Sequence, residues 1–446
     1  MSLICARLLT STVLLAALFG VPAQAQASPN QQTSGDSIAT APSSISRYTL
    51  PPEKLAKSLA LYRTREWLIV VSSIYTLAIL LAFIVSGWSV TLRNWAQRAS
   101  SRRLVQAMIV VPLFAVSFMA LRLPLAIYGH HVGLKFGLSV QGWNSWLRDW
   151  LVELGLIALV GTVVVWIFYA VAARSPRRGW FYFWLAIIPI SAFLTFVAPI
   201  AIEPLFYKYD PLAEKHAELV EALQQVSTRG GLEIPRDRMY VMQASTKLTG
   251  PNAYVTGFGA TKRIVVWDTA IQQFTPPELM MVFGHEMGHY VLYHVMWLFL
   301  VAMAFALALL FLTWSAASRI VRVRGMRLGI RGLDDWASMP VLLLVAFLIA
   351  FLAQPLLNAE SRRIEHSADI YALEVTHGFV PDAAQVDAHA FQILGENWLE
   401  YPYPCRTAVL WDWDHPTIAD RIQFALSYDP WSKGQLPRFV RTASEP

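Results

Sequence analysis

Six stretches of about 20 predominantly apolar residues limit what this chain can fold into more than any other feature of its sequence. Each stretch is long enough to cross the hydrocarbon core of a bilayer as an α-helix. Hydrophobic residues make up 55% of the 446 residues and charged residues only 15%, which is too apolar for a soluble domain of this length. We therefore predict a mainly α, polytopic membrane protein whose spans lie near 66–88, 104–128, 150–173, 180–202, 292–315 and 336–357.

Two polar segments, 203–291 and 358–446, lie between and after these spans. In the first segment, 213–228 has helical periodicity. A small β-sheet is predicted from three short β-prone runs, at 239–242, 253–256 and 263–267. A helix should begin at 275–278, where a capping-box pattern is combined with prolines in the first turn. No helix breaker follows before the fifth span, so this helix should lead into that span continuously or with a bend.

The motif His285-Glu286-Met287-Gly288-His289 lies on this predicted helix. Histidines four positions apart project from nearly one face of an α-helix, one turn apart, so both imidazoles can hold one metal ion. Glu286 is placed to take a proton from metal-bound water as a general base. A chain with ten histidines produces this pattern by coincidence about once per hundred sequences. The alternative is therefore a chance pair on a soluble helix.

A catalytic zinc ion usually has three protein ligands, so a third should appear downstream of the helix motif. Directly after the sixth span, Glu365 and Asp369 lie four positions apart and share a helical face. One of them can bind the metal while the other accepts a hydrogen bond from a ligand imidazole. The alternative is a charged helix end at which Glu and Arg side chains pair. Only Cys5 and Cys405 are present, which leaves neither a disulfide framework nor a thiolate metal site.

With these two segments the sequence resembles the membrane zinc endopeptidases of the CAAX prenyl protease type I and HtpX family, whose hallmark is H-E-x-x-H followed by S-R-x-x-E-x-x-A-D. The second motif is matched in full by Ser361, Arg362, Glu365, Ala368 and Asp369. The resemblance implies a gluzincin-like zinc protease domain with a small β-sheet. In that domain Glu286 is the catalytic residue, Asp369 supports a ligand histidine, and one zinc ion is bound by His285, His289 and Glu365. The likeness extends over residues 51–426 and favours the CAAX-type branch, in a bacterial-looking form, through Leu123-Pro124-Leu125 and the Gly137-Leu138-Ser139 loop.

The resemblance also singles out residues for substrate binding, namely Asn252, Ala253, Tyr254, His415 and Arg421. The first three lie on a predicted edge strand, which could hold an extended substrate backbone by strand addition. His415, which precedes a proline, could donate a hydrogen bond to the oxyanion or to the substrate. The alternatives are an ordinary strand-and-turn element and a structural histidine in a proline-bounded turn. We expect the remaining candidates to be interfacial or surface residues: His130, His131, His294 and His366.

The arginines of the short connections predict an orientation, because basic residues favour the cytoplasmic side. The first, third and fifth connections between spans are rich in arginine, whereas the second has only Lys135 and Arg148. With those three loops inside, both polar segments lie on the opposite side. We predict a bacterial inner-membrane protein with its active site on the periplasmic side. Four basic residues that flank the first span oppose this assignment: Lys54, Lys57, Arg63 and Arg65.

The start of the chain is predicted to precede the folded part. An apolar run followed by small residues indicates a signal peptide, or an N-terminal anchor, over 1–27. Residues 28–48 are rich in Ser, Thr, Gln, Ala and Pro and indicate a disordered leader. We expect a membrane domain with four spans at 49–204, and a zinc metalloprotease domain with two further spans at 205–446.

The predicted function is that of an integral-membrane, zinc-dependent endopeptidase acting on membrane or envelope proteins. Zinc would lower the pKa of its water to about 7, and Glu286 would take the proton. The expected partners are a peptide or protein substrate and the lipid bilayer. Nucleic acid is not expected, because the basic residues cluster between apolar runs.

Two other functions compete with this one. Eukaryotic CAAX proteases have seven spans and cleave cytoplasmic proteins, whereas this chain has six predicted spans and an outward site, so prenyl-CaaX cleavage is not the expected reaction. A non-catalytic membrane scaffold or transporter with a structural zinc ion is the competing class. Structural zinc sites usually have four protein ligands, and such a site would not explain a glutamate between two ligand histidines.

Overall fold

The computed structural model describes residues 44–257 and 259–440, so the predicted signal peptide and most of the predicted leader lie outside the described residues. Among the described residues, six helices are long and apolar enough to cross a membrane. This confirms the prediction of a mainly α, polytopic membrane protein. The spanning helices are α2 (Pro52–Val85), α4 (Arg103–Phe136), α5 (Trp143–Arg174), α6 (Gly179–Phe196), α11 (His294–Leu328) and α12 (Met339–Thr376).

Several spanning helices extend beyond the predicted apolar runs, because backbone hydrogen bonding continues where the side chains become polar. α2 begins at Pro52, and its polar first turns contact the C-terminal part of the chain. There Lys54 pairs with Glu396 at 2.7 Å, so one basic residue that opposed the predicted orientation has an internal partner. α6 ends at Phe196, before the end of the predicted fourth span, and the short helix α7 (Ala198–Ile202) follows it.

A four-stranded mixed sheet forms the second part of the fold, in the order β1-β2-β4-β3. Its strands are β1 (Tyr209–Pro211), β2 (Met239–Met242), β3 (Ala253–Thr256) and β4 (Arg263–Trp267). β2 and β4 are parallel, and the outer strands β1 and β3 pair antiparallel to them. The three predicted strands are confirmed, and β3 lies at an edge as expected. β1 was not predicted, because a three-residue strand that ends in proline has no recognisable period.

The remaining helices pack around this sheet or connect the spans. They are α3 (Trp88–Ala99), α8 (Ala217–Arg229), α9 (Asp268–Gln273), α10 (Pro276–Val291), α13 (Ala383–Asn397), α14 (Arg406–Asp412) and α15 (Ile418–Ser427). Single 3-10 turns lie between them: η1 (Glu203–Leu205), η2 (Leu212–Glu214), η3 (Arg236–Arg238), η4 (Ala244–Thr246), η5 (Gly259–Thr261) and η6 (Trp336–Ser338). One continuous core joins the sheet to α8, α10 and the end of α12, and it includes Leu223, Val265, Met281 and Tyr371.

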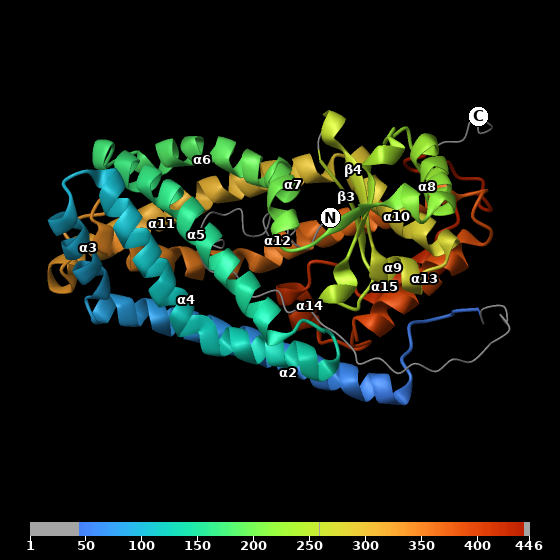
Figure 1. The fold of residues 1–446 in the computed structure, drawn as a ribbon, viewed down its shortest axis with the longest axis horizontal. Coiled ribbons are helices and arrows are strands. Elements are labelled where there is room, and N and C mark those ends of the chain that lie inside the picture. Colours follow the sequence, from blue (N-terminus) through green and yellow to red (C-terminus); the bar gives the residue numbers. More distant parts are fainter. Residues whose placement is uncertain (1–43, 258, 441–446) are drawn as a thin grey trace.

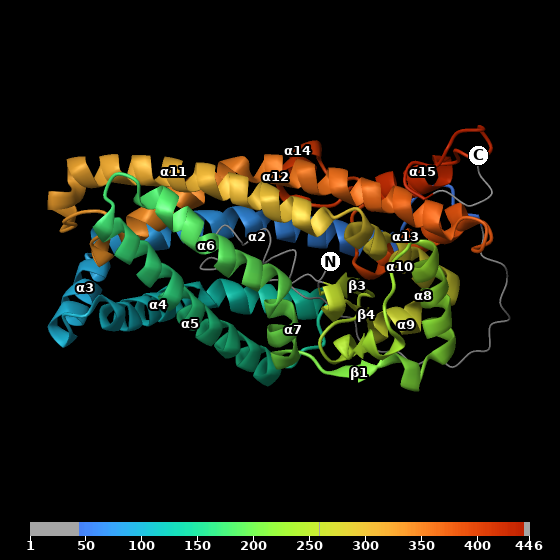
Figure 2. The same ribbon diagram turned by 90° about the horizontal axis from the view of Figure 1, so that it is seen from above.

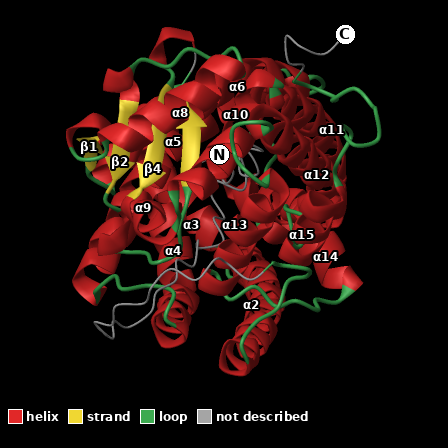
Figure 3. Ribbon diagram, turned by 90° about the vertical axis from the view of Figure 1, so that its right-hand side faces the viewer, coloured by secondary structure: helices red, strands yellow, loops and turns green. Residues whose placement is uncertain are grey.

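The long helices run along the longest axis of the molecule, and the sheet is gathered at one end with α8, α10 and α13 (Figure 1). Helix α3 lies at the opposite end in both this view and the perpendicular one (Figure 2). Seen along the long axis, the sheet lies to one side of α11 and α12 (Figure 3).

Helices α10 and α12 approach each other closely, which brings the two motif segments together. Glycines on α10 make the approach possible. A Cβ at Gly284 would lie 3.0 Å from Val375 Cγ1, and one at Gly288 would lie 3.0 Å from Tyr371 Cβ. Larger side chains at these two positions would push the helices apart.

The helix that carries the motif is interrupted before the fifth span and does not continue straight into it. α10 ends at Val291, and Tyr293 adopts a left-handed conformation with φ of 58° before α11 begins at His294. Of the two expected arrangements, continuous or bent, the bent one is observed. This break determines where His294 lies.

Candidate metal centre

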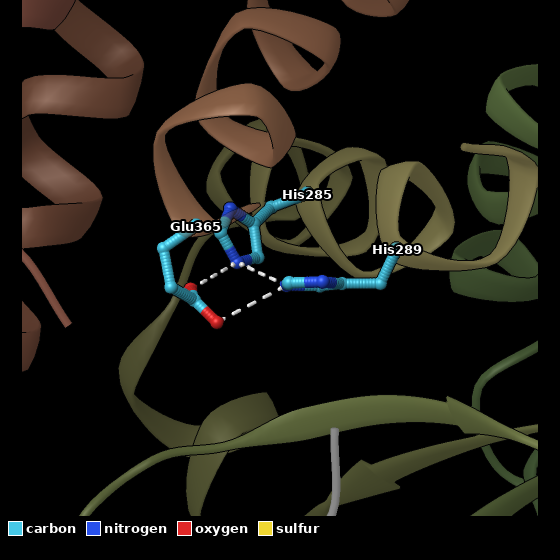
Figure 4. A group of neighbouring side chains, drawn as sticks. All are labelled: His285, His289 and Glu365. Carbon is cyan, nitrogen blue, oxygen red and sulfur yellow. Dashed lines mark hydrogen bonds and ion pairs between the residues drawn. The ribbon is translucent and has the colours of Figure 1, made fainter. Parts of the chain in front are cut away.

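Three side chains from two helices converge on one point (Figure 4). His285 and His289 come from α10, and Glu365 comes from α12. The Nε2 atoms of the histidines lie 3.1 Å apart. The Glu365 carboxylate lies 3.2 Å from His285 Nε2 through Oε2 and 3.5 Å from His289 Nε2 through Oε1. The structure therefore brings together all three predicted ligands.

This cluster fits a zinc ion in spacing and in chemistry. Ligand atoms of a tetrahedral site with bonds of about 2.0–2.1 Å stand roughly 3.3 Å apart, and two imidazoles with one carboxylate form a familiar catalytic donor set. His289 and Glu365 are each only 6% exposed. Glu365 Oε2 accepts no hydrogen bond from the described part of the chain, which leaves a buried anionic oxygen in need of a cation.

His285 is oriented from behind by an acid and an arginine. Its Nδ1 lies 2.8 Å from Asp369 Oδ1, so a proton on Nδ1 leaves the Nε2 lone pair free for a metal. Asp369 is 1% exposed and is held by two hydrogen bonds from Arg421, at 2.6 and 3.1 Å. Burial lowers the pKa of His285, but the carboxylates of Asp369 and Glu365 outweigh it and raise that pKa to about 9. The two carboxylates thus favour a positive charge at the position of His285 Nε2.

His289 is oriented in the same way by a residue that the sequence did not point to. The Nδ1 atom of His294 lies 3.2 Å from His289 Nδ1, and His294 is 8% exposed. The expectation that His294 is an interfacial or surface residue is therefore wrong. On a continuous helix, five positions would turn His294 well away from His289. Only the left-handed Tyr293 returns it, and a break of that kind leaves no periodic signal.

Glu286 lies on α10 between the two histidine ligands and is half-buried. The capping box of α10 is formed as predicted, with Thr275 and Glu278 each bound to the other's backbone. It fixes where the helix begins and hence which face presents the motif. Glu278 is also paired with His389 of α13. The helix that carries the motif is thereby tied to the C-terminal helices.

His415, a predicted substrate-binding residue, lies beside the cluster of His285, His289 and Glu365. Its Nε2 is 3.3 Å from Glu365 Oε1, its Nδ1 is 2.8 Å from Asp414 Oδ1, and its side chain is 49% exposed. The lowering effect of burial on the pKa of His415 is outweighed by the Glu365 and Asp414 carboxylates, which raise it to about 9. The imidazole thus lies between two carboxylates, and open space can reach it.

Arg362 of the second motif fixes the segment that leads to His415. Its guanidinium donates to the carbonyl of Val409, at 2.9 Å, and to that of Trp413. The second motif thus supplies a candidate ligand through Glu365, a carboxylate that contacts His285 through Asp369 and an anchor through Arg362. These three residues lie three and four positions apart because they share one face of α12.

The remaining substrate candidates lie in less open positions. Tyr254 is 2% exposed, and its hydroxyl donates to Glu203 at 2.8 Å, so only its backbone can meet a substrate. Ala253 is also buried, and the Asn252 side chain accepts a hydrogen bond from the Ala253 backbone. Arg421 is 8% exposed and faces Asp369 rather than open space.

Comparison with known proteins gives family matches over most of the chain. Residues 213–429 match the model of peptidase family M48, and residues 37–208 match the model described as CAAX prenyl protease N-terminal, five membrane helices. An uncharacterized metalloprotease, YhfN of Bacillus subtilis, is 32% identical over 77% of this chain and 78% of its own length. A probable CAAX prenyl protease 1 of Schizosaccharomyces pombe is 30% identical over 54% of this chain and 53% of its own.

A solved structure also shares the fold. The crystal structure of S. mikatae Ste24p superposes with a TM-score of 0.74 and covers 85% of this chain and 90% of that chain, at 23% sequence identity. At this identity the likeness concerns the fold. The bundle of long helices with a small sheet at one end is thus an arrangement already known from experiment.

Proposed function

Because the chain belongs to peptidase family M48, as an integral-membrane metalloprotease of the CAAX prenyl protease type, we propose that it is a zinc-dependent endopeptidase acting on membrane or envelope proteins. The observation that carries the proposal is the convergence of His285, His289 and Glu365, whose ligand atoms lie within 4.8 Å of one another. One zinc ion per chain would be held by these three side chains. A fourth position would remain open for water, as in catalytic rather than structural sites.

The chain's own residues supply the proton transfer and the orientation. When bound, zinc would lower the pKa of a water molecule to about 7 and polarise the substrate carbonyl. Glu286 accepts the proton of the attacking water and passes it to the leaving amine. Asp369 and His294 hold the two ligand imidazoles in the tautomer that presents Nε2. His415 donates to the carbonyl oxygen as negative charge develops there.

The substrate is proposed to bind as an added strand. β3 is an edge strand that packs beside α10, so its outer backbone groups can pair with an extended peptide. Among the candidates on this strand, the backbone of Ala253 and Tyr254 would make these contacts and their side chains would not. Recognition through backbone groups suits an endopeptidase that acts on unfolded or extended segments.

We also propose that the site lies on the periplasmic side of a bacterial inner membrane. The support is that the arginine-rich connections lie together, far from the metal centre. Arg93 of α3 pairs with Asp335, which precedes α12, at 2.6 Å, and Arg103 of α4 pairs with the adjacent Asp334 at 3.3 Å. Helix α3 and the sheet lie at opposite ends of the molecule (Figure 1). Basic connections favour the cytoplasm, which leaves the metal centre on the other side.

The proposal is tested with the purified full-length protein in detergent and an unfolded test protein as substrate. Cleavage should stop when a chelator removes the metal and should return when zinc is added back in equimolar amount. A zinc-replete protein that cleaves no peptide would instead support the competing function, a membrane scaffold with a structural zinc ion.

A further inference from the structure

A cavity of about 790 Å³ lies at the arginine-rich end of the bundle, away from the metal centre. It is formed by the end of α5, the outer turns of α11 and the connection from α11 to α12. Its size is in the usual range for sites that hold part of an organic ligand. Residues from three separate parts of the chain line it, among them Ala173, Trp314, Val321, Arg322, Arg331 and Asp334.

The charge in this cavity is positive and largely uncompensated. Arg322 is exposed and has no carboxylate partner in the part of the chain that the structure describes. The side chain of Arg331 makes one long contact, 3.4 Å to Gln97 Oε1. Asp334 also lines the cavity, but its carboxylate is already paired with Arg103. Two guanidinium groups are therefore available to an anion.

The cavity changes from apolar to cationic along α11. Trp314 forms part of its wall and is fixed in place, because its ring occupies the space that a Cβ at Gly179 would need. Arg322 follows Trp314 by eight residues, which is about 12 Å along a helix. The polar headgroup layer begins within about that distance of the hydrocarbon edge. The wall thus follows the polarity of a lipid molecule from its chains to its headgroup.

We propose that this cavity binds an anionic phospholipid, with the phosphate on Arg322 and Arg331 and the upper acyl chain against Trp314 and Val321. Basic pockets at the ends of spanning helices are suited to anionic headgroups, since two arginines can share one phosphate. A zwitterionic headgroup carries its own cation, which these arginines would repel. The site is separate from the metal centre, so its occupancy does not depend on the proposed reaction.

The test uses native mass spectrometry on the full-length protein in a mild detergent. Phosphatidylglycerol and phosphatidylcholine with identical chains are added in turn, and retained lipid is counted. Preferential retention of phosphatidylglycerol, with no binding of inorganic phosphate alone, is expected, because the apolar wall contributes as well as the arginines. Equal retention of the two lipids would overturn the proposal, and binding of inorganic phosphate as tight as that of the lipid would reduce the site to an anion site.

Variants locate the binding. Replacing both cavity arginines, R322Q with R331Q, should weaken phosphatidylglycerol retention roughly tenfold or more. The matched pair R319Q with R327Q removes the same charge from exposed positions of α11 outside the cavity and should leave retention nearly unchanged. If both pairs weakened it equally, only general surface charge would be involved.

A steric variant separates the cavity from its charge. Ala173→Trp fills the cavity from an exposed position while it keeps both arginines, and it too should reduce retention. Unchanged cleavage of the test protein by each variant would show that it is folded. Full lipid retention by a folded Ala173→Trp variant would place the lipid elsewhere.

Discussion

The Nδ1 atoms of His289 and His294 lie 3.2 Å apart, so each ligand histidine of the candidate metal centre has its own partner behind it. For His285 this partner is Asp369, whose carboxylate contacts Nδ1 of the imidazole. For Nε2 of His289 to offer its lone pair to a metal, Nδ1 must carry the proton and donate a hydrogen bond to Nδ1 of His294.

Replacing His294 should therefore weaken metal binding without removing a ligand. We expect His294→Ala to reduce zinc affinity by about 10–100-fold, the usual effect of losing such a partner. Competition with a zinc chelator of known affinity measures this. His131→Ala, at an exposed histidine of α4, is the matched control and should bind zinc as the parent protein does. Parent-like affinity in His294→Ala would show that the contact has no orienting role.

Arg421 should matter for stability as well as for metal binding. It is the ion-pair partner of Asp369, which is almost completely buried. Arg421→Ala would leave that carboxylate without its cation, and the expected loss of stability is about 3–5 kcal/mol. Thermal unfolding of the metal-free protein measures it, so the result does not depend on activity. If Arg421→Ala instead left unfolding unchanged and raised only KM, Arg421 would act on substrate, as the sequence resemblance suggested.

Asp387 of α13 should make stability depend on pH. It is 3% exposed, and its Oδ2 has no hydrogen-bond partner among the described residues. Burial first, and then the nearby Asp369 carboxylate, raise the pKa of Asp387 to about 8, against the opposing effects of Arg421 and His285. The folded state therefore holds a proton that the unfolded state has released. Its contribution to stability declines as pH rises from about 4 to about 8.

An asparagine at position 387 resembles the protonated acid at every pH. Asp387→Asn should therefore unfold at nearly the same temperature as the parent protein near pH 4, and at a higher temperature above about pH 8. Thermal unfolding at the two pH values provides the comparison. The same difference at both would mean that Asp387 does not titrate in this range.

The orientation can be tested through a single cysteine. Cys405 is exposed at the start of α14, in the same C-terminal part of the chain as His415. In a variant without Cys5, an impermeant thiol reagent should label Cys405 on cells whose outer membrane has been made permeable and whose inner membrane is intact. Labelling only after the inner membrane is disrupted would place the site in the cytoplasm.

The sequence predicted best those features that repeat along a helix or fill a bilayer. The six spans follow from apolar length, and the pairing of His285 with His289 follows from their spacing of one helical turn. The choice of Glu365 rather than Asp369 as third ligand came only from the family resemblance. β3 and β4 were recognised from β-branched and aromatic runs bounded by glycine or proline. Each of these signals is local, so it survives without knowledge of the fold.

What could not be predicted depends on contacts between distant segments. Tyr254 lies on the expected strand, yet its side chain turns to Glu203 in the 3-10 turn η1. Arg421 matched a motif, but which group it faces is determined by the packing of α15 against α12. His294 required a left-handed residue at position 293, which a tyrosine does not signal. Sequence patterns predicted the type of each element here, but not the direction in which these side chains point.

The central claim is that this metal centre performs hydrolysis with Glu286 as its base. The most direct test measures zinc content and cleavage of the test protein on the same samples of Glu286→Gln, with Glu360→Gln as the control, since Glu360 pairs with Arg363 outside the ligand set. We predict one zinc ion per chain in both variants, parent-like cleavage in Glu360→Gln, and a rate lower by about 10²–10⁴-fold or more in Glu286→Gln. A zinc-replete Glu286→Gln protein that cleaves at the parent rate would contradict the proposed mechanism.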